Sequence, residues 1–185
     1  MAGTVRPYLV CLLIFVLGAS RVLADSCVGA SSVAATNQQY RVDGQVDRDT
    51  KKWTYVLTDV KTGEKRTGPL PEIEWHAHLY FFLSQDCKRF AVLDASAGHH
   101  LTNRFLIYSA EGKLIASLGV NDILTKDEQA KVDQSISHIH WLKHDPTSRS
   151  YGKCLPSENT VSLTTVADRT VVISLADGKL IKNKE

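Results

Sequence analysis

The sequence predicts an all-β domain with one short helix, in which antiparallel hairpins form stacked sheets. Short apolar segments recur at short intervals, polar turns that often contain glycine separate them, and one hairpin-like segment occurs more than once. Many short strands at such spacing are typical of all-β domains. A β-sandwich is the alternative arrangement of the same hairpins. Residues 40–185 are expected to form this single β-rich domain, which is long enough to bury a core.

The strands are expected one after another from residue 40 onward. Trp53, Tyr55 and Leu57 alternate with polar neighbours, which is the pattern of a half-buried strand. A turn follows, and the chain runs back until Pro69 breaks it. Further strands are expected at residues 76–83, 90–93, 104–108, 114–118, 136–142, 161–166, 170–175 and 180–182.

Three segments of the chain are not expected to be strands. Residues 25–39 are rich in small and polar residues, which predicts a flexible N-terminal lead, and residues 144–158 are predicted to be a long polar loop. Within residues 120–134, Thr125 and Glu128 form a capping box, whose hydroxyl and carboxylate satisfy the first free amides of a helix. We therefore expect one short helix there, covering an open edge of the sheets.

One hairpin-like segment is repeated along the chain. Phe105–Ile115 aligns without gaps on Val171–Ile181, with six of eleven positions identical, and Tyr55–Gly63 is a weaker third copy. Each copy consists of a strand and a turn containing glycine, and in the first two a returning strand follows. Glycine supplies the positive φ that a tight hairpin needs.

A larger unit around the middle copy, residues 79–118, contains strand, polar turn, strand, loop, strand, acidic-glycine turn and strand. This unit resembles one blade of a β-propeller, in which four antiparallel strands form each radial sheet. Residues 139–182 form a looser second unit. Cys87 stands where glycine commonly follows the aspartate of the first turn in a blade, and the WD dipeptide is missing. The resemblance implies propeller-blade-like sheets and identifies no particular family.

The length of the chain limits how such blades can assemble. Blades take about 40–50 residues and closed rings typically need four or more, whereas this chain has room for two to three. The sheets therefore form an open stack, join other copies in a ring, or make a sandwich with blade-like hairpins. We expect a compact monomeric stack.

Residues 1–24 have the layout of a secretory signal peptide. Arg6 precedes a short apolar core, and small residues lead to a cleavage site expected between Ala24 and Asp25. The apolar core is shorter than the roughly 20 residues of a transmembrane helix; an uncleaved anchor is the alternative that Arg21, close to the cleavage site, leaves open. The mature protein is therefore expected to be secreted or periplasmic, with no stable membrane span.

The charge of the chain argues against nucleic acid as a partner. The formal net charge is +2. Arg6 and Arg21 of the predicted signal account for both charges, so the mature chain is neutral. Its basic residues are interspersed with acidic ones, whereas nucleic-acid-binding proteins carry basic patches or stripes.

The cysteines fit an oxidising compartment. Cys11 lies within the predicted signal, which leaves Cys27, Cys87 and Cys154. One pair of three can close, and we predict the disulfide between Cys87 and Cys154, both in turns inside the domain. Cys27, near the new N-terminus, is left as a tail thiol or as a bridge between two subunits.

Histidines form the main reactive cluster. Two His-x-His pairs place both imidazoles on one face of a strand, where they can share a divalent metal with a third histidine. The alternative is that these are half-buried polar residues that bond to the backbone. The seven histidines are His76, His78, His99, His100, His138, His140 and His144.

These patterns predict an exported, non-catalytic β-domain that binds an unknown protein or small-molecule ligand. No catalytic residue, cofactor-binding residue or metal ligand is assigned, because the chain has no nucleophile elbow and no phosphate-binding glycine loop. We expect no cofactor, and a monomer or small homo-oligomer. The alternative is a small His-rich metal-binding protein or metal-dependent enzyme.

Overall fold

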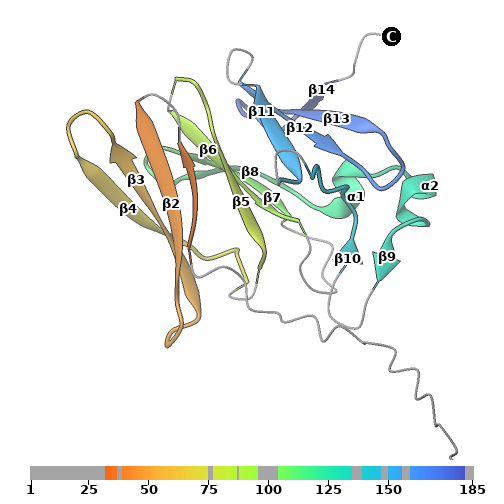
Figure 1. Ribbon diagram of the computed structural model, residues 1–185, viewed down its shortest axis with the longest axis horizontal. Coiled ribbons are helices and arrows are strands. Elements are labelled where there is room, and N and C mark those ends of the chain that lie inside the picture. The colour runs from red at the N-terminus through yellow and green to blue at the C-terminus, as the bar shows by residue number, and fades with distance from the viewer. Residues whose placement is uncertain are drawn as a thin grey trace, which may run out of the picture.

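The described part of this computed structural model forms three four-stranded antiparallel sheets, one two-stranded sheet and two short helices (Figure 1). It covers residues 32–36, 39–74, 77–86, 88–95, 104–134, 139–146, 150–155 and 159–181. The all-β class predicted from the sequence is confirmed. In each four-stranded sheet the spatial order of the strands follows the chain, so every sheet is an up-and-down meander. None of the helices in these ranges is long and apolar enough to span a membrane.

Sheet 1 is the N-terminal sheet. Trp53, Tyr55 and Leu57 are buried and their neighbours are more exposed, which confirms the predicted alternation. The Trp53 indole N–H donates to the Glu74 carbonyl at 3.0 Å, so this buried polar group is satisfied. The strands are β1 (Ser32–Thr36), β2 (Tyr40–Asp47), β3 (Lys52–Asp59) and β4 (Lys65–Leu70).

Strand β1 lies within residues 25–39, which the sequence analysis assigned to a flexible lead. It pairs with β2 along its whole length, from Ser32 opposite Gln45 to Thr36 opposite Arg41. The free edge of β2 offers backbone groups that need partners, and short segments of small residues can supply them without a strong strand pattern of their own. The structure therefore adds a strand that composition alone did not indicate.

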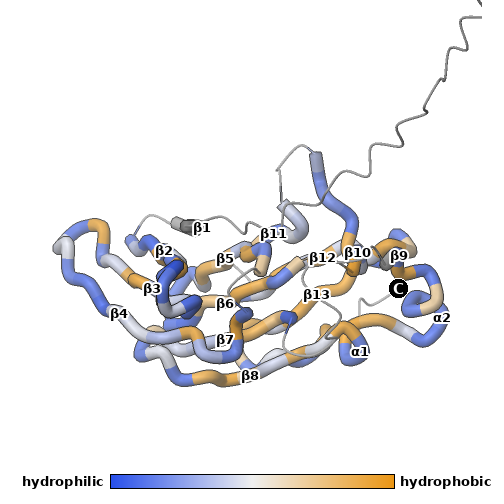
Figure 2. The backbone as a smooth tube through the Cα atoms, turned by 90° about the horizontal axis from the view of Figure 1, so that it is seen from below, coloured by the Kyte–Doolittle hydropathy of each residue, from blue (hydrophilic) through white to orange (hydrophobic). Residues whose placement is uncertain are grey.

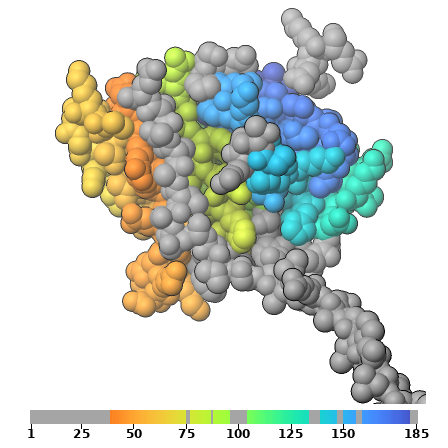
Figure 3. Space-filling view, viewed as in Figure 1, coloured from red at the N-terminus to blue at the C-terminus, as the bar shows by residue number. Residues whose placement is uncertain are grey.

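Sheet 2 is the middle layer, with sheets 1 and 3 on either side of it (Figure 3). Strands β6 and β7 are buried almost throughout. Phe90 and Val92 of β6 pack against sheet 1, whereas Ala91 and Leu93 pack against sheet 3. Because alternate side chains enter two different cores, these strands appear in the sequence as continuous apolar runs. The strands are β5 (Leu79–Leu83), β6 (Arg89–Asp94), β7 (Phe105–Ser109) and β8 (Leu114–Leu118).

Sheet 3 completes the stack and corrects one prediction. Residues 152–155 form β11, inside the segment predicted to be a polar loop; this strand pairs with β12, Cys154 opposite Val161. Its four residues include a glycine and a lysine and show no alternation of apolar and polar residues that would predict a strand. The strands are β11 (Gly152–Leu155), β12 (Thr160–Thr164), β13 (Thr170–Ser174) and β14 (Leu180–Ile181), and the two-stranded sheet consists of β9 (Asp133–Gln134) and β10 (Ile139–His140).

The repeated segment occupies the same place in every sheet. Each copy is the hairpin between the third and fourth strands, and its glycine has the predicted positive φ: 76° at Gly63, 82° at Gly112 and 75° at Gly178. The strand register next to the glycine turn is the same in sheets 1 and 3. Thr58 pairs with Lys65 around Gly63, and Ile173 pairs with Leu180 around Gly178. In sheet 2, Ile115 is an extra residue, a bulge.

Two one-turn helices stand where one short helix was expected, α1 (Val120–Ile123) and α2 (Lys126–Gln129). The predicted capping box is present, since Thr125 Oγ1 accepts from the Glu128 N–H and the Glu128 carboxylate accepts from the Thr125 N–H. Val120 and Ile123 are buried in the core between sheets 2 and 3. The helices therefore close one end of that core rather than lying free on the surface.

Glu128 joins helix α2 to the turn between β12 and β13. Its carboxylate accepts from Arg169 Nε at 2.9 Å, from Arg169 Nη2 at 2.5 Å and from the Thr165 hydroxyl at 2.8 Å. Arg169 Nη2 also donates to the Ile123 carbonyl at 2.8 Å. Hydrogen bonding from Arg169 lowers the pKa of Glu128 to about 2, against the opposing effect of burial.

We expect Gly112→Ala to destabilise the protein much more than Gly63→Ala. Both glycines have positive φ, which costs alanine about 1–2 kcal/mol. A Cβ on Gly63 meets no atom within 4 Å, whereas a Cβ on Gly112 would lie 2.3 Å from the Tyr55 hydroxyl oxygen. Urea unfolding should therefore give a loss of about 3 kcal/mol or more for Gly112→Ala, partly restored by Tyr55→Phe. Equal losses at the two glycines would contradict this packing.

We expect Glu128→Gln to destabilise the protein at neutral pH, by on the order of 3 kcal/mol. The folded pKa of Glu128 lies below its ordinary value of 4.5. Its contribution is therefore fully present above pH 4.5 and is lost as the pH falls towards 2. The difference between wild type and variant in urea unfolding should shrink over that range. Asp168→Asn, which removes the exposed ion pair with Lys143, is the control, with an expected change below about 0.5 kcal/mol.

Candidate functional site

The histidines that the structure describes do not converge. His78 precedes β5 and is half-buried; His140 is exposed in β10; His144 packs against the Tyr151 ring. Within the described ranges, no group of three or more His, Cys, Asp or Glu side chains is placed to hold a metal. His76, His99, His100 and His138 lie outside the described residues, so each His-x-His pair has one undescribed member. The metal hypothesis stays a prediction.

Cys154 forms no disulfide with any residue that the structure describes. It is half-buried in β11, and its Sγ lies 3.4 Å from the carbonyl oxygen of Leu83, the last residue of β5. Burial raises the pKa of the Cys154 thiol. Cys87, its predicted partner, lies outside the described residues, as do Ala24 and Asp25 of the predicted cleavage site. These assignments therefore stay predictions.

Leu83 and Gln85, at the end of β5 and just beyond it, lie close to Cys154 and Asn159. Besides the contact of Sγ with Leu83, the backbone N–H of Gln85 donates to the Asn159 side-chain oxygen at 3.1 Å. The described residues that follow β5 and precede β12 are therefore neighbours.

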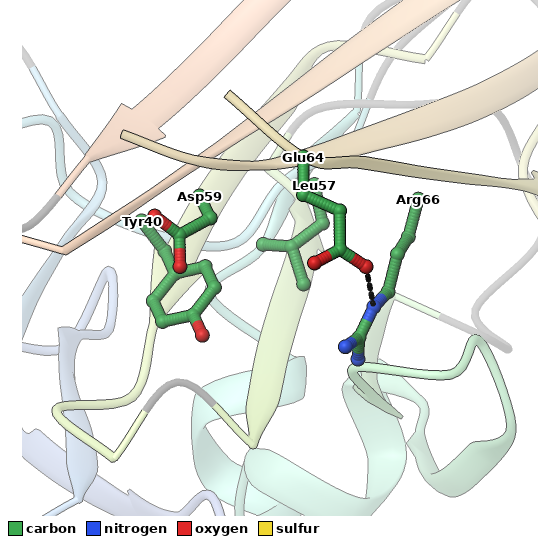
Figure 4. A pocket seen from close by; sticks show the side chains of 5 residues that line it. All are labelled: Tyr40, Leu57, Asp59, Glu64 and Arg66. Carbon is green, nitrogen blue, oxygen red and sulfur yellow. Dashed lines mark ion pairs between the residues drawn. The ribbon is translucent and has the colours of Figure 1, made fainter. Parts of the chain in front are cut away.

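A small depression lies at the end of the β3–β4 hairpin (Figure 4). Its volume of about 20 Å³ suffices for roughly one water molecule. The Asp59 carboxylate accepts the backbone N–H groups of Thr62 and Lys61, and these bonds lower the pKa of Asp59. The residues around it are Tyr40, Leu57, Asp59, Glu64 and Arg66.

The charged groups of this depression serve the fold. Arg66 Nε lies 3.8 Å from Glu64, and Arg66 Nη1 lies 3.9 Å from Glu111 in the hairpin of sheet 2. The pair with Glu64 lies within one hairpin, and the pair with Glu111 connects the hairpins of two adjacent sheets; each exposed pair contributes little stability. With its small volume, this place is a junction between sheets rather than a ligand site.

A larger depression lies on sheet 3, where β11 begins and β12 ends. Its volume is about 190 Å³, the space of roughly six water molecules. The lining combines ammonium, carboxylate, hydroxyl and phenol groups on a rigid sheet. We call it the β11–β12 depression; its lining residues are Lys143, Asp145, Tyr151, Gly152, Lys153, Ser162 and Thr164.

Backbone pairing holds the β11–β12 depression in shape. The Lys143 N–H donates to the Thr164 carbonyl at 2.8 Å, and the Asp145 N–H donates to the Ser150 carbonyl at 2.9 Å. Lys153 pairs with Ser162 across β11 and β12. The Lys143 ammonium forms an ion pair with Asp168, beside the turn that follows β12. Lys153, Ser162 and Thr164 therefore project from strands, and backbone hydrogen bonds hold Lys143 and Asp145 beside them.

Sequence reasoning did not find this site. Its residues come from β12, from the segment predicted to be loop and from Lys143 just before that segment, and they are spread over positions 143 to 164. The single local signal is the alternation of Ser162 and Thr164 with buried Val161 and Leu163. That pattern identifies a half-exposed strand and does not indicate which polar groups gather beside it.

Comparison with known proteins does not place the chain in a family: no family model and no curated protein matches it. The class is therefore defined by the fold and the site, as an all-β protein of stacked antiparallel sheets with a polar depression on the last sheet.

We expect the mature protein, purified from an oxidising compartment, to contain one free thiol of three, on Cys27. Under denaturing conditions, the number of titratable thiols should rise to two in Cys154→Ser, because that substitution releases Cys87. It should fall to none in Cys27→Ser. A bridge that closes so long a loop stabilises the fold by about 4 kcal/mol in the chain-entropy model. Three free thiols in the wild type would contradict the predicted pair.

Proposed function

We propose that this chain is an exported, non-catalytic binding module whose ligand occupies the β11–β12 depression. The observation that carries the proposal is the lining itself, in which two lysines, a carboxylate, two hydroxyls and a tyrosine surround an open space of about 190 Å³. Small-ligand sites use a few placed polar groups to orient the ligand, and this depression supplies such groups together with one aromatic ring. Export rests on the signal-like layout of residues 1–24.

We further propose that the three sheets are blades of a shortened propeller. In each sheet the strands follow one another outward, and the repeated glycine hairpin joins the last two. The first strands β1, β5 and β11 lie next to one another along one side of the molecule, with β4 and β8 on the opposite side (Figure 2). This arrangement is that of blades arranged around an axis.

We propose that the stack acts as a monomer, open at both ends. The outer face of sheet 1 is polar, with the Arg41 guanidinium held on the Asp43 carboxylate at 2.7 and 2.8 Å. The outer face of sheet 3 carries Ser162, Thr164 and Thr170 beside Val172 and the exposed Ile181, so it is polar over β12 and more apolar towards β14. Polar outer faces are what the terminal units of a stacked repeat need in water.

The proposed function is tested by a thermal-shift panel on the mature protein. The probes are cellohexaose, N-acetylchitohexaose, succinate, glutamate and adenosine monophosphate, each at 10 mM. For a ligand of about 1 mM affinity, the melting temperature should rise by about 3–5 °C.

The same panel includes a variant with the depression altered, Lys153→Ala combined with Thr164→Val, in which the shift should disappear. Thr58→Val, on the outer face of sheet 1, is the matched control and should keep it. If none of the five probes shifts the wild type, or if the shift persists in the double variant, the proposed site is wrong.

A further inference from the structure

Tyr151 is held in a defined position at the β11–β12 depression. Its ring makes a T-shaped contact with Tyr80 of β5, with centroids 5.4 Å apart and planes at 72°, and a second one with His144, at 5.1 Å and 70°. Burial and the neighbouring Tyr151 raise the pKa of Tyr80, so that residue stays a neutral phenol. Two T-shaped contacts fix the orientation of Tyr151 before any ligand arrives, which reduces the entropic cost of binding to it.

The charges around the depression balance. Lys143 and Lys153 are opposed by Asp145 and by Asp168, which forms an ion pair with Lys143. Among the described residues, the charges of the lining and of Asp168 therefore sum to zero and give no net attraction for an ionised ligand. Ammonium donors, carboxylate acceptors and hydroxyls that do both suit a ligand with many neutral hydroxyl groups.

A row of paired residues crosses the outer face of sheet 3 and begins with two residues of the depression, Lys153 and Ser162. Cross-strand pairing places Lys153 opposite Ser162, Ser162 opposite Val172 and Val172 opposite Ile181. Partners in such pairs share one face of a sheet. Ile181 is 45% exposed. The row therefore runs from polar residues beside the depression to an apolar residue in contact with water.

From these features we infer that the ligand is a neutral oligosaccharide: one sugar ring packs on Tyr151 in the β11–β12 depression, and further units follow the row towards Ile181. A sugar ring has an apolar C–H face that packs on an aromatic ring and a rim of hydroxyls that donate and accept hydrogen bonds. The size of the depression suits one such ring, and the row supplies contacts for a chain of them. This inference rests on the proposed binding function and names its ligand class.

The test is isothermal titration of the mature protein with cellohexaose, N-acetylchitohexaose and maltohexaose, and with hexagalacturonate as an acidic analogue. At least one neutral hexasaccharide should bind, about tenfold more tightly than its own disaccharide, because the row adds contacts. Its affinity should change less than about twofold between 0.05 and 0.5 M NaCl, since neutral ligands are not subject to salt screening.

Substitutions at Tyr151 and Ser162 test whether the sugar packs on the Tyr151 ring. Tyr151→Phe keeps the ring and should bind within about threefold of wild type, whereas Tyr151→Ala should lose about tenfold or more. Ser162→Ala, on the exposed face of β12, should weaken binding while leaving the melting temperature unchanged, so the inference can be tested even if Tyr151→Ala fails to fold. Thr54→Ala on sheet 1 is the matched control.

Three outcomes overturn the inference: no neutral hexasaccharide binds, hexagalacturonate binds more tightly and with steep salt dependence, or Tyr151→Ala and Ser162→Ala bind as the wild type does. If succinate, glutamate or adenosine monophosphate occupies the depression in the thermal-shift panel while the saccharides do not bind, the binding function stands and the ligand class is wrong. If substitutions in the depression change the binding of no probe in either experiment, both the proposed function and the ligand class are wrong.

Discussion

The rest of the structure depends on the burial of sheet 2 on both faces. Phe90, Val92, Leu106 and Tyr108 face sheet 1, and the residues between them face sheet 3. Removing apolar area from water contributes about 25 cal/mol per Å², so a sheet with two apolar faces is stable only between two partners. Sheets 1 and 3 need just one apolar face each, which leaves their outer faces free for polar groups and, on sheet 3, for the β11–β12 depression.

Local signals in the sequence were enough to predict the hairpins and the fold class. The repeated glycines hold positive φ because the turn geometry demands it, and the β3 alternation of Trp53, Tyr55 and Leu57 follows directly from one buried face. Strands β1 and β11 were not predicted, since each is a short segment whose pairing depends on the free edge of a neighbour. Such a segment forms a strand because the neighbouring strand offers a free edge, so its own residues need not show a strand pattern.

The candidate site was harder to predict for the same physical reason. Histidine pairs are visible in a sequence because their members are adjacent, but adjacency says little about which distant groups meet. The β11–β12 depression has the opposite character: Lys143, Tyr151 and Thr164 gather there only because three segments pair in one sheet. Its chemistry becomes visible once strand register is known, because register determines which polar side chains share a face.

The two kinds of sheet also limit how a protein of this design can grow. A unit like sheet 2, apolar on both faces, can be inserted by duplication only between sheets 1 and 3, since elsewhere it would expose an apolar face to water. The end sheets, whose glycine hairpins share one pairing pattern, act as caps and must remain at the ends. Adding sheets in the middle of the stack would leave the β11–β12 depression intact on the last sheet. The number of sheets and the outer surface of the last sheet can therefore evolve independently.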